Sequence, residues 1–389
     1  MQASGNGVSI TGGTVKACAG VDSNDLSDCV QFSVCIFGSG AKVNISGDAN
    51  VTCSYANTQV RGRVIYSTYS GSASDYGVTI STSGMVNCKA GKDIGVQGSY
   101  APGEEGERHV AEECTGSSIK IENNGGTYTF AGGDCDGSQG ISYGLYSQYN
   151  VDISSQKNGD NAGSITITSG ELSGTDTTYL RKSIAVYSIA GSVNINADTS
   201  TDFTITSGNV PTVKTLGTDG SYCIYASGNI NLNTGNLKIN AGTTYASPTK
   251  NSAYACGVRS TGGNVNVGVS GGKYDSATLT IKVANTTGNS ATYGIRADGS
   301  LMKVNFNSGK MFVSAGKYYY SSSAYQKNGY DVGTPSNSAG IVRNATFSEY
   351  NPSTKKSQYI QQDSFDESFV LYQVNTLVLE YNATKSGEN

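Results

Sequence analysis

Short alternations of apolar and polar residues recur along most of this chain. In the first kind of phrase, a small residue is followed by an aliphatic residue, which we call the anchor, and then by an aromatic or polar residue. The phrase occurs nine times, as Cys35-Ile36-Phe37, Val64-Ile65-Tyr66, Gly95-Val96-Gln97, Gly144-Leu145-Tyr146, Ala185-Val186-Tyr187, Cys223-Ile224-Tyr225, Gly257-Val258-Arg259, Gly294-Ile295-Arg296 and Gly340-Ile341-Val342. Because neighbouring residues of a strand face opposite sides, each phrase predicts a strand with one buried and one solvated face.

Two further apolar-polar-apolar triplets follow most of these phrases. The first copies of the second and third triplets are Val43-Asn44-Ile45 and Val51-Thr52-Cys53. Consecutive parallel strands of an ordinary sheet need a long crossover, whereas short strands repeated in a constant order suit a solenoid. We therefore predict an all-β, single-stranded parallel β-helix with about nine coils of three short strands.

The repeat also predicts the domain organisation. We expect an N-terminal cap over residues 1–30, the β-helix over residues 31–345 and a last coil or cap over residues 346–389, because an open terminal coil is an unpaired edge. The alternative is an all-β sandwich. It requires no phrase repeated in this order, and the Cys-Trp-Cys pattern of immunoglobulin domains cannot occur in a chain without tryptophan.

Composition excludes several other classes of protein. Charged residues make up only 14% of the 389 residues, and Gly, Ser, Thr, Asn and Tyr fill the positions that charged helix formers occupy in helical proteins. The net charge of −4 argues against a nucleic-acid partner. There is no apolar run long enough for membrane insertion, and residues 1–13 lack the basic and apolar regions of a signal peptide.

Two of the units resemble a known group of proteins. The phrases from Tyr222 to Leu232 and from Tyr293 to Gly299 are similar to the rungs of bacterial cell-surface β-helix proteins that are often labelled as carbohydrate-binding domains. The resemblance covers about residues 30–345. It implies a right-handed β-helix, an extracellular or cell-surface location and a glycan-binding role, and it supplies no catalytic residue.

The outward positions after the anchors provide the candidate binding site. They predict an exposed column of side chains spaced about 5 Å apart, which we call the outer aromatic column. Its members are Phe37, Tyr66, Gln97, Tyr146, Tyr187 and Tyr225, followed by Arg259 and Arg296. Exposed aromatic rings suit the apolar faces of sugars or another protein surface. Alternatively, the rings pack on one another or under a neighbouring loop.

The other two strands predict polar rows. Outward positions of the second strand are Asn44, Thr79, Lys120, Asp152, Asn194, Asn231, Asn266 and Asn305. Those of the third strand include Thr52, Thr129, Thr166, Thr204 and Thr280. We expect these rows to form side-chain hydrogen-bond ladders along the solenoid, as in stacked sheets.

No set of residues predicts catalysis, a cofactor or a metal site. The segment from Pro102 to Cys114 holds the single histidine, His109, beside five glutamates, and we expect a solvated loop there instead of an acid-base pair or a cation site. Asp152 with Lys120, and Arg259 with Arg296, lack an evident set of further partners.

The nine cysteines match no zinc-binding spacing. Cys53 and Cys88 occupy inward positions, where a thiol acts as a small apolar filler. Cys18 with Cys29, and Cys114 with Cys135, are expected in loops and are disulfide candidates for a secreted protein.

The sequence is compatible with three functions. The first is a non-catalytic extracellular or cell-surface protein for adhesion or glycan binding, whose partner is a glycan or another cell-surface polymer. The second is a structural subunit that assembles with copies of itself into an extracellular filament or sheath. The third is a polysaccharide lyase or hydrolase, which requires a cleft lined by carboxylates.

Overall fold

The chain folds as an all-β solenoid. The computed structural model describes residues 1–20, 32–58, 61–92, 108–135, 140–173, 181–213, 220–246, 254–268, 278–288, 291–298, 304–307, 309–319, 326–328, 330–333, 356–364 and 370–378. These residues contain strands, turns and bends and no helix.

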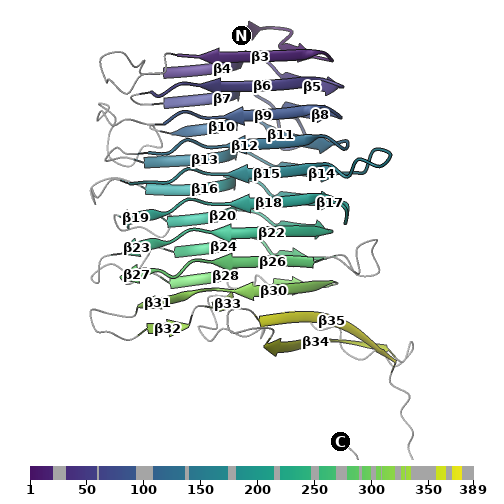
Figure 1. The fold of residues 1–389 in the computed structure, drawn as a ribbon, viewed down its shortest axis with the longest axis vertical. Coiled ribbons are helices and arrows are strands. Elements are labelled where there is room, and N and C mark those ends of the chain that lie inside the picture. The colour runs from purple at the N-terminus through teal and green to yellow at the C-terminus, as the bar shows by residue number, and fades with distance from the viewer. Residues whose placement is uncertain are drawn as a thin grey trace, which may run out of the picture.

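Three long sheets run the length of the molecule, and each coil contributes one strand to each sheet (Figure 1). The first sheet contains β1 Gln2–Ser4, β4 Phe32–Ser39, β7 Arg61–Ser67, β10 His109–Cys114, β13 Gly140–Ser147, β16 Arg181–Ser188, β20 Gly220–Ala226, β24 Tyr254–Ser260, β28 Ala291–Ala297 and β33 Tyr330–Gly333. The second contains β2 Val8–Ile10, β5 Val43–Gly47, β8 Tyr76–Thr82, β11 Ser118–Asn123, β14 Val151–Ser155, β17 Val193–Ala197, β21 Ile230–Thr234, β25 Val265–Val267 and β29 Val304–Phe306. The third contains β3 Thr14–Ala19, β6 Asn50–Tyr55, β9 Met85–Lys89, β12 Thr127–Ala131, β15 Ser164–Thr168, β18 Asp202–Thr206, β22 Asn236–Ala241, β26 Thr278–Val283, β30 Lys310–Ser314, β35 Val370–Val378 and β34 Lys356–Ser364.

The register confirms the predicted parallel β-helix of three strands per coil. Anchors of successive coils are Cα partners, as in Ile36 with Ile65 and Leu145 with Val186. The second sheet has nine strands, one per complete coil. Strand spacing of about 4.8 Å makes this stack roughly 40 Å long.

Two predicted anchors differ from the structure. Val96 and Ile341 lie outside the described residues. Glu112 pairs with both Ile65 and Leu145 and so takes the third anchor position, and Val332 pairs with Ile295 at the ninth. The segment predicted as a solvated loop therefore ends in strand β10. The spacing from Glu112 to Ile119 in β11 equals the spacing from the anchor Val186 to Val193 in β17, as expected for an anchor position.

The N-terminal end of the solenoid departs from the predicted cap. Residues 2–19 form a complete first coil, because β1, β2 and β3 pair in parallel with β4, β5 and β6. At the other end, β34 and β35 form an antiparallel hairpin, and β35 joins β30. Two short sheets complete the fold: β19 Val210–Val213 with β23 Thr244–Ala246 and β27 Thr287–Gly288, and β31 Lys317–Tyr319 with β32 Gln326–Asn328.

The inward side chains of all three sheets form one continuous core. It runs from Val8 to Val313, and most of its aliphatic side chains are fully buried. Period-two burial in the second and third sheets, as in Val151–Ser155, matches the alternation of the sequence. Cys53 and Cys88 belong to this core, as predicted.

The first sheet has a bend before each anchor. The strand pairing skips the small residue at this point. Val34 pairs with Arg63 and Ile36 pairs with Ile65, but Cys35 and Val64 between them are not paired. Both the small residue and the anchor are buried in the core. At Gly144 the space is so restricted that an added Cβ would lie 2.6 Å from the Ala185 carbonyl oxygen. The bend brings the outward side chains on either side of it together.

Candidate functional site

The outer aromatic column forms, but most of it is inaccessible. Phe37 stacks on Tyr66 with ring centroids 5.0 Å apart, and Tyr187 lies 5.6 Å from Tyr146 and 5.2 Å from Tyr225. Tyr146, Tyr187 and Tyr225 are only 4%, 8% and 7% exposed. The prediction of an exposed platform is therefore wrong for these three tyrosines. Phe37 and Tyr66 are half-buried.

A second row of outward side chains packs against the column. Tyr143 lies 5.0 Å from Tyr146, and Tyr222 lies 5.1 Å from Tyr225, because the bend turns these pairs toward one another. Together with Ile141, Ile184 and Val110 they form a second apolar cluster on the outside of the first sheet. On this face of the first sheet the aromatic rings pack on one another, which was the alternative to an exposed binding platform.

Charged groups interrupt the column in its N-terminal half. Gln97 lies outside the described residues, and Glu113 occupies its position between Tyr66 and Tyr146. The fully buried Glu113 carboxylate accepts hydrogen bonds from Arg63 Nε at 2.6 Å and from Arg108 Nη2 at 2.8 Å. Each guanidinium also lies over a tyrosine ring of the column. The two arginines therefore balance the negative charge of the buried Glu113 carboxylate next to the apolar cluster.

Arg259 and Arg296 end the column with a partner that the sequence did not reveal. Arg259 donates to Asp298 at 2.8 Å and to the Tyr222 hydroxyl at 2.9 Å, and Arg296 donates to the same aspartate. The ring of Tyr254 lies 4.8 Å from one guanidinium carbon and 4.2 Å from the other. The two arginines thus belong to a packed structural cluster.

On the second sheet, the outward row forms the predicted ladder over part of its length. Each asparagine amide donates to the preceding coil: Asn194 to Asp152 at 2.6 Å, Asn231 to Asn194 at 2.6 Å, Asn266 to Asn231 at 2.7 Å and Asn305 to Asn266 at 2.7 Å. The Tyr76 hydroxyl donates to the other oxygen of Asp152 at 2.7 Å. Burial and this bond raise the pKa of Tyr76 to about 12.

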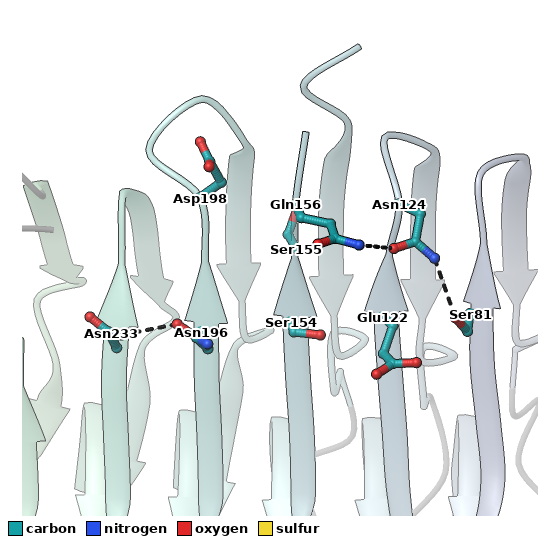
Figure 2. Close-up of a pocket in the computed structure, with 9 residues that line it drawn as sticks. All are labelled: Ser81, Glu122, Asn124, Ser154, Ser155, Gln156, Asn196, Asp198 and Asn233. Atoms are coloured by element: carbon teal, nitrogen blue, oxygen red, sulfur yellow. Dashed lines mark hydrogen bonds between the residues drawn. The ribbon is translucent and has the colours of Figure 1, made fainter. Parts of the chain in front are cut away.

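The next outward row on the same sheet forms the floor of a polar groove. Its floor residues are partners on successive strands: Ser81, Glu122, Ser154, Asn196 and Asn233. Asn124, Ser155, Gln156 and Asp198 complete the lining, and the volume is about 590 Å³. Figure 2 shows the five floor residues on neighbouring strands, with Asn124 and Asp198 at the loops beyond them.

Hydrogen bonds along the groove hold several of its side chains in place. Asn233 donates to Asn196 at 2.9 Å, Gln156 donates to Asn124 at 2.9 Å, and Asn124 donates to Ser81 at 3.3 Å. An amide that donates through one hydrogen still has a second N–H available for a ligand. The groove therefore presents partly pre-organised donors and acceptors at the spacing of the coils.

The two carboxylates of the groove are held by other groups. Glu122 pairs with Lys120 at 2.7 Å, and both side chains are about one third exposed. Asp198 accepts from the Ser200 backbone N–H at 3.0 Å and from its hydroxyl at 2.9 Å. No lysine or arginine is among the described residues that line the groove. The lining thus favours uncharged ligands over anionic ones.

The sequence prediction of polar rows included one outward position of each second strand and did not include the groove. Its floor lies two residues beyond the asparagine row, where alternation again predicts outward side chains. The polar residues at all five floor positions were the feature of the sequence that could have indicated the groove.

The disulfide candidates lie in different places from those predicted. Cys18 is exposed within strand β3, and Cys29 lies outside the described residues. Cys114 is buried at the end of β10 with its sulfur 3.0 Å from the Ser117 hydroxyl, whereas Cys135 contacts the Ile141 carbonyl oxygen. Cys114 and Cys135 are therefore not joined in this structure.

Comparisons with protein-family models, curated proteins and solved structures give no match to this chain. In the described part of the chain no helix is long and apolar enough to cross a membrane.

Proposed function

We propose that this protein is a non-catalytic extracellular or cell-surface binding protein, and that it holds a neutral polysaccharide strand along the groove of the second sheet. The observation that carries the proposal is the repetition of polar side chains at one position on five successive strands, from Ser81 to Asn233. A periodic floor suits a periodic ligand.

The dimensions of the groove support this ligand class. Successive floor residues are about 4.8 Å apart, so the floor extends over roughly 19 Å. A pyranose unit advances an extended polysaccharide by a similar step, and each unit presents hydroxyl groups that both donate and accept. Serine hydroxyls and asparagine amides also do both. Repeated contacts of this kind add up to useful affinity although each is weak.

Charge complementarity favours a neutral strand. Lys120 offsets the charge of Glu122, whereas Asp198 repels polyanions, and the described residues that line the groove include no basic side chain to attract them. We therefore expect neutral glucans or mannans to bind and polyuronates to bind poorly.

The test is binding of soluble neutral polysaccharides by affinity electrophoresis or calorimetry. Changing Asn196 and Asn233 together to Ala is expected to weaken binding about tenfold or more, because each lost hydrogen bond costs about 1 kcal/mol. Thr166 and Thr204, which are partners on the outer face of the third sheet, provide the matched control when changed to Ala. Equal binding by the groove variant and the control variant, or no binding of any neutral polymer, would contradict the proposal.

Two carboxylates in one groove favour a second candidate, hydrolysis of the bound strand. Glu122 and Asp198 come from β11 and the turn after β17, two coils apart, so their backbones are about 10 Å apart along the axis. Carboxyl pairs of inverting glycosidases are about 6.5–9.5 Å apart, so the two side chains would have to lean toward each other to act as such a pair. Release of reducing sugars by the wild type, and its loss in Glu122→Gln, would select this candidate over binding alone.

A further inference from the structure

Three thiols gather in the core near the N-terminal end of the solenoid. Cys35 lies on β4, Cys53 on β6 and Cys88 on β9, and they are 2%, 0% and 0% exposed. Cys53 and Cys88 are Cα partners on adjacent strands. The neighbour of Cys53 on its other side is Ala17.

Cys35 approaches this pair from the first sheet. Its sulfur lies 3.1 Å from the carbonyl oxygen of Ala17 and is therefore next to Cys53. The Cys35 and Cys53 side chains interact directly, which lowers the pKa of the Cys35 thiol and raises that of Cys53.

The geometry favours Cys35 over Cys88 as the partner of Cys53. Residues in register on neighbouring parallel strands point the same way, so their Cβ atoms keep roughly the strand spacing of about 4.8 Å. A disulfide requires a Cβ–Cβ distance of about 3.8 Å. Cys35 comes from another sheet, so this spacing does not constrain it, and its thiol interacts directly with that of Cys53. The described residues contain no cluster of three Cys, His, Asp or Glu side chains suited to a metal ion.

We propose that Cys35 and Cys53 form an internal disulfide when the chain folds in the presence of a small-molecule disulfide such as oxidised glutathione. The Cys35 thiolate attacks one glutathione sulfur and releases the first glutathione thiolate. Cys53 then attacks the Cys35 sulfur of the mixed disulfide and releases the second. Two protein thiols are oxidised, one glutathione disulfide is reduced to two thiols, and the two protein protons pass to the released thiolates.

This disulfide would join two sheets within one coil. It would link the first-sheet strand and the third-sheet strand of one coil, across the whole of strand β5. A cross-link of this kind limits the freedom of the unfolded chain. It does not depend on the groove or on any ligand.

The full-length protein tests the proposal without any substitution. The chain is refolded in a buffer of oxidised and reduced glutathione, unfolded in N-ethylmaleimide to block remaining thiols, digested without reductant and analysed by mass spectrometry. We expect a cross-linked pair of peptides that contains Cys35 and Cys53, with Cys88 carrying the blocking group. Blocking of both Cys35 and Cys53, or a cross-link between Cys53 and Cys88, would overturn the proposal.

Two variants add a matched comparison. Cys88→Ser is expected to keep the cross-link, because Cys88 takes no part in it. Cys53→Ser is expected to lose the link and leave Cys35 blocked. A cross-link from Cys35 to any other cysteine in the wild type would also count against the assignment.

Discussion

At the scale of single residues, Glu112 is the most unusual side chain in the core. It occupies an anchor position between Ile65 and Leu145, it is fully buried, and neither of its oxygens has a hydrogen-bond partner. Burial raises the pKa of the Glu112 carboxyl to about 8. Burial raises the pKa values of the nearby Cys88 and Cys114 thiols as well, and the Glu112 carboxyl adds to both shifts. The structure therefore accommodates Glu112 as a neutral acid.

Because of this carboxyl, we expect the free energy of unfolding to decrease as the pH rises. Its folded-state pKa lies above its ordinary value of 4.5, so the folded state binds the proton more tightly and the contribution of Glu112 to stability is greatest at low pH. Between about pH 4.5 and pH 8 the contribution lost is on the order of 4 kcal/mol, at about 1.4 kcal/mol per pKa unit. Urea unfolding at several pH values measures it. Glu112→Gln should flatten this dependence.

Glu122→Gln is the control for that experiment, because Glu122 is one third exposed and paired with Lys120. It should leave the slope of stability against pH close to that of the wild type. If Glu112→Gln and the wild type showed the same slope, Glu112 would not be a buried neutral acid.

At the scale of elements, the end of the outer aromatic column depends on one aspartate. Asp298, just after β28, accepts hydrogen bonds from both Arg259 and Arg296, and its side chain is 16% exposed. Both arginines lie against the ring of Tyr254. Removing the aspartate would leave two buried positive charges next to each other.

Asp298→Ala is therefore expected to destabilise the fold by about 3 kcal/mol or more. Asp202→Ala removes an aspartate from an exposed pair with Lys238 and should cost about 1 kcal/mol at most. Denaturant unfolding of the two variants measures the difference. Equal losses in the two variants would show that Asp298 does not hold the arginine cluster.

The elements also show what alternation predicts and what it does not. Period-two patterning correctly placed anchors such as Ile65 and Leu145 in the core. It did not anticipate the bend at residues such as Gly144, which turns Tyr143 and Tyr146 to the same side and buries both. It also favoured Val96 over Glu112, because a glutamate is not expected inside an aliphatic core.

At the scale of the whole molecule, the sequence predicted the repeat and the order of the strands well. Both follow from local patterns that recur in each coil. The candidate site was harder to predict. Whether an outward row is open or buried depends on neighbouring side chains. The tyrosine row packs with Tyr143 and Tyr222 in a buried cluster, whereas the row from Ser81 to Asn233 forms an open groove.

Successive coils stack in register as one solenoid, and this stacking builds the floor of the groove. A distance measurement between spin labels at Ser46 and Asn233 tests it most directly. These residues are five strands apart in one outward row of the second sheet, so their backbones should be about 24 Å apart. The spin labels would be attached to cysteines introduced by Ser46→Cys and Asn233→Cys, in a chain that also carries Cys18→Ser and Cys29→Ser. We predict a single narrow distribution centred near 24 Å, displaced only by the length of the label linkers. A broad distribution, or one centred beyond about 40 Å, would contradict the stacked solenoid and with it the groove.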